Sequence, residues 1–254
     1  MNFLDTAIEA ARAAGQEIVK RLPQERDVQS KGFRDIVTDA DLAAQEALVS
    51  IIHSRFPGHG ILSEEGLKLG SDAETIWVLD PLDGTTNYAH RYPCFSVSIG
   101  VVRGNELVAG VVYDPLQEHV FCAERGAGAT MNGTRLSVSR TDQLIHALVA
   151  LDYAREPDLR VEQMAAMTHC SKYIHTFRSL GSAALSLCYV GAGWLEAYFH
   201  WTLCPWDVAA GSLIVLEAGG EITDVNGQPW HYTLPRCLAT NGVLHSAFVN
   251  ALQA

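Results

Sequence analysis

Residues 77–87 read Trp-Val-Leu-Asp-Pro-Leu-Asp-Gly-Thr-Thr-Asn, and they are the most informative segment of the chain. The first three residues are apolar and β-prone, so they predict a buried strand that ends at Asp80. Pro81 fixes the backbone after this strand. Asp83 stands three residues beyond Asp80, and side chains three apart on a strand point to opposite faces. Both carboxylates can therefore reach one ion only if the turn folds back, which makes the Leu82 carbonyl a candidate third ligand.

The next residues, Gly84, Thr85 and Thr86, stand where a helix can begin. Backbone N–H groups at such a position suit a phosphate oxygen, and glycine allows a close approach. The same residue types are common in ordinary turns. This segment alone therefore leaves a turn and a phosphate-binding loop equally open.

Three further acidic segments stand at predicted strand ends or helix starts: residues 35–41 with three aspartates, Glu64-Glu65, and Asp207 after Pro205-Trp206. Taken singly, each has an ordinary explanation as a helix cap or a solvated loop. Together they place several carboxylates where a cleft forms. Oxygen ligands select hard cations such as Mg²⁺, Mn²⁺ or Ca²⁺, and the ten histidines show no zinc-like spacing.

Periodicity predicts a chain in two parts. The first part contains helices and mostly antiparallel strands, at residues 3–22, 39–55, 61–63, 76–79, 95–102, 107–113 and 119–122, with an Asn-Gly hairpin at 132–133. Strands and helices then alternate at residues 146–151, 157–170, 173–177, 182–192, 195–199, 206–218 and 220–223. We therefore expect an antiparallel-sheet unit over residues 1–140, with most of the candidate ligands, and an α/β unit over 141–254 that carries Asp207.

Composition narrows the function classes. The chain has 254 residues, of which 48% are hydrophobic, so it can bury a sizeable core. Its net charge of −11 argues against nucleic acid and membrane surfaces as partners, but not against small phosphates that a metal ion neutralises. The six cysteines form no C-x-x-C pair, and residues 1–22 have no basic start or uninterrupted apolar run. These features predict a cytoplasmic protein with free thiols.

The order and spacing of four motifs resemble the inositol monophosphatase family, whose superfamily includes fructose-1,6-bisphosphatases and bisphosphate nucleotidases. The family pattern is D-x-V-T-x-x-D, then E-E, then D-P-[LI]-D-G-T-T-N, then W-D-x-A-A-G. In this sequence the pattern falls on residues 35–41, 64–65, 80–87 and 206–211. The resemblance implies a layered α-β-α-β-α sandwich, a Mg²⁺-dependent and Li⁺-sensitive phosphatase, and a homodimer.

The resemblance also implies roles for individual residues. A first Mg²⁺ would be held by Glu64, Asp80, the Leu82 carbonyl and Asp83. A second would be held by Asp80, Asp83 and Asp207, and Glu65 would hold a weaker third through water. Mn²⁺ could replace Mg²⁺ at these positions.

The remaining implied roles concern water and substrate. Asp41 and Thr85, with Glu65, would orient and deprotonate the attacking water. The substrate side would be formed by Asp83, Gly84, Thr85, Gly181, Ser182, Ala183 and residue 200. Inositol-preferring members usually carry a Glu at that last position, where this chain has His200. A neutral histidine offers one acceptor where a carboxylate offers several, so His200 predicts either a rim residue that has drifted or a changed substrate preference.

These observations predict hydrolysis of phosphate monoesters by a metal-activated water, with inositol-1-phosphate as the best single substrate. The same chemistry leaves NADP(H) 2′-phosphate, fructose bisphosphate, histidinol phosphate and 3′-phosphonucleotides open. A non-enzymatic regulatory protein is the alternative of another class. The presence of every implied metal acid and of Thr85 counts against it.

Overall fold

The structure is a computed structural model that describes residues 2–24 and 27–253. The first part of the chain forms α1 (Phe3–Arg21), β1 (Val28–Gly32), β2 (Asp35–Thr38), α2 (Asp39–Arg55), β3 (Gly60–Ser63), β4 (Lys68–Leu69), β5 (Thr75–Asp83), α3 (Thr85–Ala89), β6 (Ser96–Arg103), β7 (Glu106–Asp114), β8 (His119–Glu124), β9 (Gly128–Met131) and β10 (Thr134–Arg135). Strands β3 to β10 make one sheet in the order β10-β9-β8-β7-β6-β5-β3-β4. Neighbours are antiparallel except β3 and β5, which are parallel.

The second part forms a 3₁₀ turn (Leu144–His146), β11 (Leu148–Leu151), α4 (Pro157–Cys170), β12 (Thr176–Arg178), α5 (Ala183–Gly191), β13 (Ala197–His200), α6 (Pro205–Glu217), β14 (Glu221–Thr223), β15 (Cys237–Thr240) and α7 (His245–Leu252). Its sheet has the order β12-β11-β13-β15-β14. Strand β11 is parallel to both β12 and β13, whereas β15 runs antiparallel to its neighbours. The two sheets use separate stretches of chain, but a division into two units near residue 140 stays a prediction.

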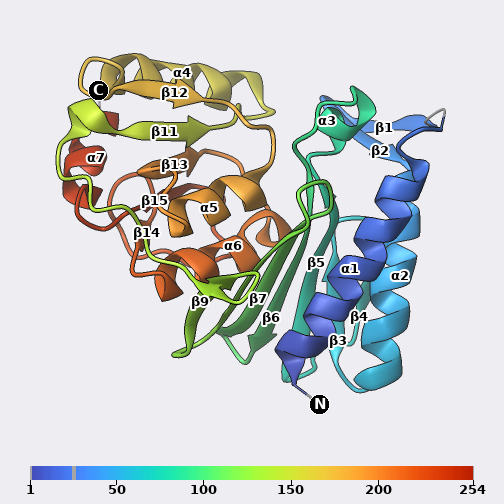
Figure 1. Ribbon diagram of the computed structural model, residues 1–254. Coiled ribbons are helices and arrows are strands. Elements are labelled where there is room, and N and C mark those ends of the chain that lie inside the picture. Colours follow the sequence, from blue (N-terminus) through green and yellow to red (C-terminus); the bar gives the residue numbers. More distant parts are fainter. Residues whose placement is uncertain (1, 25–26, 254) are drawn as a thin grey trace.

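The elements stack in five layers, so the predicted α-β-α-β-α sandwich is confirmed (Figure 1). Helices α1 and α2 cover one face of the larger sheet, and α5 and α6 cover the other. The smaller sheet lies on the far side of α5 and α6, and α4 and α7 close its outer face. Alternation along β11 shows how one strand serves two layers, because Val149 packs toward α4 and α7 while Ala150 packs toward α5 and α6.

Small residues bring α6 close to the larger sheet. A Cβ added at Gly100 would lie 2.6 Å from the Ala209 Cβ, and one at Gly110 would lie 2.8 Å from the Ala210 carbonyl oxygen. On its other side, α6 packs Gly211 against Leu187 of α5. The small residues Ala209, Ala210 and Gly211 therefore let α6 pack closely against its neighbours. This packing fixes the position of the start of the helix, where Asp207 lies.

Several predicted elements differ from the structure. The segment predicted as a strand from 146 begins as a 3₁₀ turn, and the one predicted from 173 begins only at Thr176, because turns follow α4. Periodicity missed the hairpin β1–β2, whose first strand is exposed throughout and carries no hydrophobic alternation. It also missed β15 and α7, which are short. Among the described helices, none combines the length and the apolar character needed to cross a bilayer.

Candidate active site

One cavity of about 770 Å³ collects most of the predicted site residues. Its lining includes Glu64, Asp80, Leu82, Asp83, Gly84, Thr85, Gly181, Ala183, His200 and Asp207. They come from the ends of β3, β5 and β13 and from the starts of α3, α5 and α6. Segments of the chain that lie more than 100 residues apart in sequence therefore meet at one place.

A β-bulge brings the two aspartates of β5 to one face. The strand does not end at Asp80 as predicted but continues to Asp83. Asp80 pairs with Ser98 and Asp83 pairs with Ser96. The two aspartates are three residues apart on β5, whereas their partners are two residues apart on β6. The extra residue restores the two-residue alternation, and both carboxylates face the cavity. The Leu82 N–H donates to Asp80 Oδ1 at 3.1 Å and fixes that carboxylate.

Asp83 joins the larger sheet to the start of α5 through its carboxylate. Its Oδ2 accepts hydrogen bonds from the hydroxyls of Ser96 and Ser182 and from the N–H of Ala184. Its Oδ1 accepts only the N–H of Ala183, at 3.2 Å. The start of α5 is thus attached to β5 by an acid of the site, and Oδ1 is the oxygen that keeps capacity for another partner.

Asp41 and Thr85 form the pair predicted to act on water. The Thr85 hydroxyl lies 3.0 Å from Asp41 Oδ1 and 3.0 Å from the Leu82 carbonyl oxygen, so its single hydrogen can serve either acceptor. Asp41 Oδ2 accepts the N–H of Thr38 at 2.8 Å and its hydroxyl at 2.5 Å, which completes the capping box of α2. Burial is the main cause that raises the pKa of Asp41 to about 7. The ordinary capping role and a chemical role therefore use different oxygens of one side chain.

Asp207 is held in the same way at the start of α6. Its Oδ2 accepts the Cys204 N–H at 2.6 Å, as the third residue of a capping box. Burial, followed by the charge of Glu64, raises the pKa of Asp207 to about 8. The hydrogen bond from Cys204 acts in the opposite direction.

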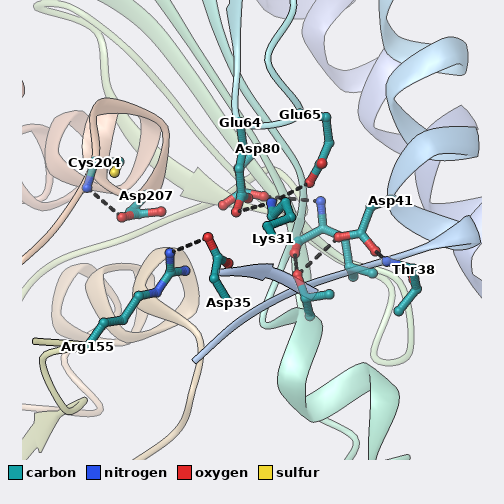
Figure 2. Close-up of polar contacts among 12 residues, drawn as sticks. Lys31, Asp35, Thr38, Asp41, Glu64, Glu65, Asp80, Arg155, Cys204 and Asp207 are labelled. Atoms are coloured by element: carbon teal, nitrogen blue, oxygen red, sulfur yellow. Dashed lines mark hydrogen bonds and ion pairs between the residues drawn. The ribbon is translucent and has the colours of Figure 1, made fainter. Parts of the chain in front are cut away.

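Lys31 on β1 is a member of the site that the sequence did not reveal. Its ammonium nitrogen lies 3.1 Å from Glu64 Oε1 and 3.0 Å from Glu65 Oε1 (Figure 2). Burial opposes the charge of Lys31, but the two glutamates outweigh it and raise the pKa of the ammonium group. Glu64 lines the cavity, whereas Glu65 does not.

The remaining carboxylates fit a divalent cation by their chemistry. Burial, followed by the charges of Glu64, Asp83 and Asp207, raises the pKa of Asp80 well above its usual range. Burial and mutual repulsion disfavour the ionised state of these acids, and a bound hard cation would offset both effects. Within residues 2–24 and 27–253, however, no three acidic, histidine or cysteine side chains are arranged to hold a metal ion as they stand. The predicted ligand set therefore rests on donor chemistry and not on coordination distances.

Two residues predicted to bind substrate, Ser182 and His200, also have structural duties. Ser182 is fully buried, donates to Asp83, and accepts the Leu185 N–H as the cap of α5, so its side chain does not line the cavity. His200 is 6% exposed, and its Nδ1 accepts the Thr202 N–H at 3.0 Å. Burial lowers its pKa to about 4, so the ring is neutral. His200 therefore lines the cavity without a free acceptor nitrogen on that side.

The tight packing of Gly84 gives a test of this geometry. Gly84 has φ 91° and caps α3, and an added Cβ would lie 3.0 Å from the Cys94 carbonyl oxygen and 3.1 Å from that of Gly181. Gly84→Ala is expected to lower the free energy of unfolding by about 1–3 kcal/mol, because both the backbone strain and the contacts are unfavourable. Thermal denaturation checks this, with Gly66→Ala as control, since Gly66 also has positive φ but has open space around it. Equal losses in the two variants would show that only the backbone conformation matters.

A cavity lined by carboxylates, with an acid–hydroxyl pair beside a glycine turn, is an arrangement that suits a metal-dependent phosphatase. Comparison with known proteins agrees with this class. The whole chain, residues 1–254, matches the inositol monophosphatase family, and the chain belongs to that family. Members of the family are phosphoric monoester hydrolases that generally depend on Mg²⁺.

Individual relatives support the assignment over almost the full length. The chain is 39% identical to inositol monophosphatase 2 of Solanum lycopersicum, covering 98% of this chain and 97% of the relative. It is also 39% identical to Nus factor SuhB of Pasteurella multocida, over 99% and 96% of the two chains. Among solved structures, the extragenic suppressor protein suhB from Bartonella henselae superposes with a TM-score of 0.95 at 33% identity, over 98% and 97%.

Proposed function

We propose that this phosphatase hydrolyses the phosphate ester of a small polyol, with inositol-1-phosphate as the best single substrate. The observation that carries the proposal is that Asp80, Asp83, Asp207 and Thr85 line one cavity, while Asp41, which does not line it, contacts the Thr85 hydroxyl. The family name of the relatives supports the inositol skeleton. The family relationship also favours an enzyme over a regulatory binding protein.

The proposed cofactor is Mg²⁺, held by Glu64, Asp80, the Leu82 carbonyl, Asp83 and Asp207, as two or three ions, with Mn²⁺ as a substitute. When bound there, Mg²⁺ supplies positive charge that offsets the phosphate and lowers the pKa of water. Li⁺ is expected to compete at one of these positions and to inhibit.

The chain's own groups perform the remaining steps. The N–H groups of Gly84 and Thr85 hold a phosphate oxygen at the start of α3, where the backbone turns through a positive φ. The Thr85 hydroxyl accepts a hydrogen bond from the attacking water and passes its own hydrogen toward Asp41 Oδ1. Asp41 acts as the base, because its carboxylate is buried and already oriented by Thr38.

A substrate panel tests the proposal. Phosphate release is measured from inositol-1-phosphate, NADP⁺, fructose-1,6-bisphosphate, histidinol phosphate and 3′-phosphoadenosine 5′-phosphate, each with Mg²⁺, with EDTA, and with Mg²⁺ plus Li⁺. We expect Mg²⁺-dependent release that is fastest from inositol-1-phosphate. Fastest release from another compound would replace the substrate, and no release from any would refute the proposed activity.

We expect Mg²⁺ to stabilise the protein by an amount that depends on the pH, because it binds to a cluster of acids. Asp83 and Asp207 have pKa values of about 6 and about 8, above their ordinary value of 3.8. The folded state thus binds their protons more tightly than the unfolded state, and stability is lost as the pH rises from about 4 toward about 8. Because Mg²⁺ binds only the ionised acids, it should raise Tm more at about pH 8 than at about pH 5. Thermal denaturation with Mg²⁺ or EDTA at both pH values measures this, and an equal shift at both would contradict it.

Two further properties belong to the proposal. The free cysteines are Cys94, Cys122, Cys170, Cys188, Cys204 and Cys237, and this set is compatible with a reducing compartment such as the cytoplasm. A homodimer is proposed from the family relationship. The acidic net charge of −11 supports small metabolites, and not nucleic acid or membranes, as partners.

A further inference from the structure

Asp152 is an acid of the cavity that neither the metal set nor the water-activating pair uses. It directly follows β11 and lines the cavity. Strand β11 runs parallel to β13, with Leu151 opposite Phe199, so the next residues along, Asp152 and His200, end neighbouring strands at the same edge of the sheet. Side chains at such an edge face whatever occupies the crevice there.

His200 does not accept hydrogen bonds from a substrate. Its Nδ1 is occupied by the Thr202 N–H, and its other nitrogen is tied to the backbone of Tyr153. The ring thereby fixes the segment that contains Asp152. The hydrogen-bond acceptor at this edge is consequently the carboxylate on β11 and not the imidazole on β13.

The carboxylate of Asp152 is oriented but not used up. Its Oδ1 accepts the Gly181 N–H at 2.7 Å and the Ser179 hydroxyl at 3.2 Å. Burial raises the pKa of this carboxyl to about 7, and the hydrogen bonds from Gly181, Ser179 and Leu180 act in the opposite direction. A carboxylate has about four lone-pair directions, so at least one remains for a further donor. The hydrogen-bonded loop 179–181 leads directly to Ala183, whose N–H contacts Asp83. The Gly181 carbonyl packs against Gly84, so Asp152 reaches the phosphate-binding turn through Gly181. An ionised phosphate has no hydrogen to donate to a carboxylate, so the donor that Asp152 can meet belongs to the leaving group.

Charged side chains of both signs line the same cavity. Arg34, Arg155 and Arg160 are accompanied by Asp35 and Glu156, and Arg155 is paired with Asp35 at 3.0 Å. A hydroxyl can donate to the Asp152 carboxylate without bringing a further charge into the cavity, and an ammonium substituent is the alternative that the experiment separates.

We propose that Asp152 accepts a hydrogen bond from a hydroxyl of the leaving group and so makes this phosphatase selective for polyol phosphates. The inference rests on the proposed phosphatase activity and adds the residue that reads the alcohol. Asp152 is a specificity-determining residue that acts on the substrate and not on the attacking water.

Asp152→Asn tests the proposal, because the amide oxygen can still accept the Gly181 N–H while the second oxygen becomes a donor. Kinetics are compared for inositol-1-phosphate, for p-nitrophenyl phosphate, whose leaving group has no hydroxyl besides the one released, and for histidinol phosphate, which carries an ammonium. We expect kcat/KM for inositol-1-phosphate to fall about 10- to 100-fold, mainly through KM. For p-nitrophenyl phosphate it should change less than about twofold. The control is Asp158→Asn, which removes an exposed carboxylate in the first turn of α4 and should change neither.

Three outcomes would overturn the inference. Equal losses on inositol-1-phosphate and p-nitrophenyl phosphate would show that Asp152 only positions the loop 179–181. No loss on either would show that it makes no contact with substrate. A larger loss on histidinol phosphate would identify an ammonium as its partner. Failure of the proposed function itself is distinct, because the unmodified chain would then release no phosphate from any of the three with Mg²⁺.

Discussion

Asp207→Asn is expected to lower Mg²⁺-dependent phosphate release by about 10²–10⁴-fold, since charge stabilisation by a bound metal contributes several kcal/mol to such a reaction. The substitution is nearly isosteric, and the amide oxygen can keep the hydrogen bond from the Cys204 N–H. The lost group is the oxygen that the helix cap does not use. Initial rates at saturating substrate, measured over a range of Mg²⁺ concentrations, give the size of the effect.

The same variant should be more stable than the unmodified protein when EDTA is present. Asp207 is partly buried, and this burial and the neighbouring acids Glu64 and Asp83 disfavour its charged form. Removing that charge therefore relieves repulsion that only a cation otherwise offsets. Asp142→Asn, at an exposed position, serves as the control for both activity and Tm. An active Asp207→Asn protein, or one that is destabilised in EDTA, would contradict the assignment of Asp207 as a metal ligand.

Asp41→Asn is expected to reduce kcat by about 10²–10⁴-fold, the usual contribution of a general base, while KM changes little. The unmodified enzyme should gain activity as the pH rises through about 7, because burial raises the pKa of Asp41 to about 7 and the base acts when deprotonated. The residual activity of the variant should not show this rise near pH 7. Steady-state kinetics from about pH 5.5 to about pH 9 provide the measurement.

Asp39→Asn is the matched control for Asp41→Asn. Asp39 lies in the same first turn of α2, but its carboxylate is 40% exposed and faces Arg21 at 3.6 Å instead of Thr85. It should retain the rate and the pH profile of the unmodified enzyme. If Asp41→Asn keeps the same pH profile at a reduced rate, a different group is the base.

Two acids of the site could be predicted from the sequence because they also have a local structural duty. Asp41 and Asp207 complete capping boxes, and such boxes are visible as a spacing in the sequence. Asp80 follows an apolar strand, which is an equally local pattern. The bulge that aligns Asp80 with Asp83 was not predictable, because it depends on the pairing of β5 with β6.

Residues that reach the site through tertiary contacts escaped the sequence analysis. Lys31 lies on an exposed strand without hydrophobic alternation, and only the folding of the β1–β2 hairpin places it between Glu64 and Glu65. Asp152 follows a short strand and carries no motif, so its place beside His200 appears only once β11 and β13 are paired. The sequence drew attention to residue 200, whereas we propose Asp152, which follows the neighbouring strand, as the carboxylate that faces the substrate.

The most direct test of the central claim is the dependence of hydrolysis on the metal. The protein is treated with EDTA and dialysed, and the initial rate of phosphate release from inositol-1-phosphate is measured as Mg²⁺ is added back. The carboxylate cavity predicts no release without Mg²⁺ and a rate that rises to saturation as Mg²⁺ is restored. An undiminished rate in EDTA would contradict the assignment of these buried acids as the metal site of a phosphatase.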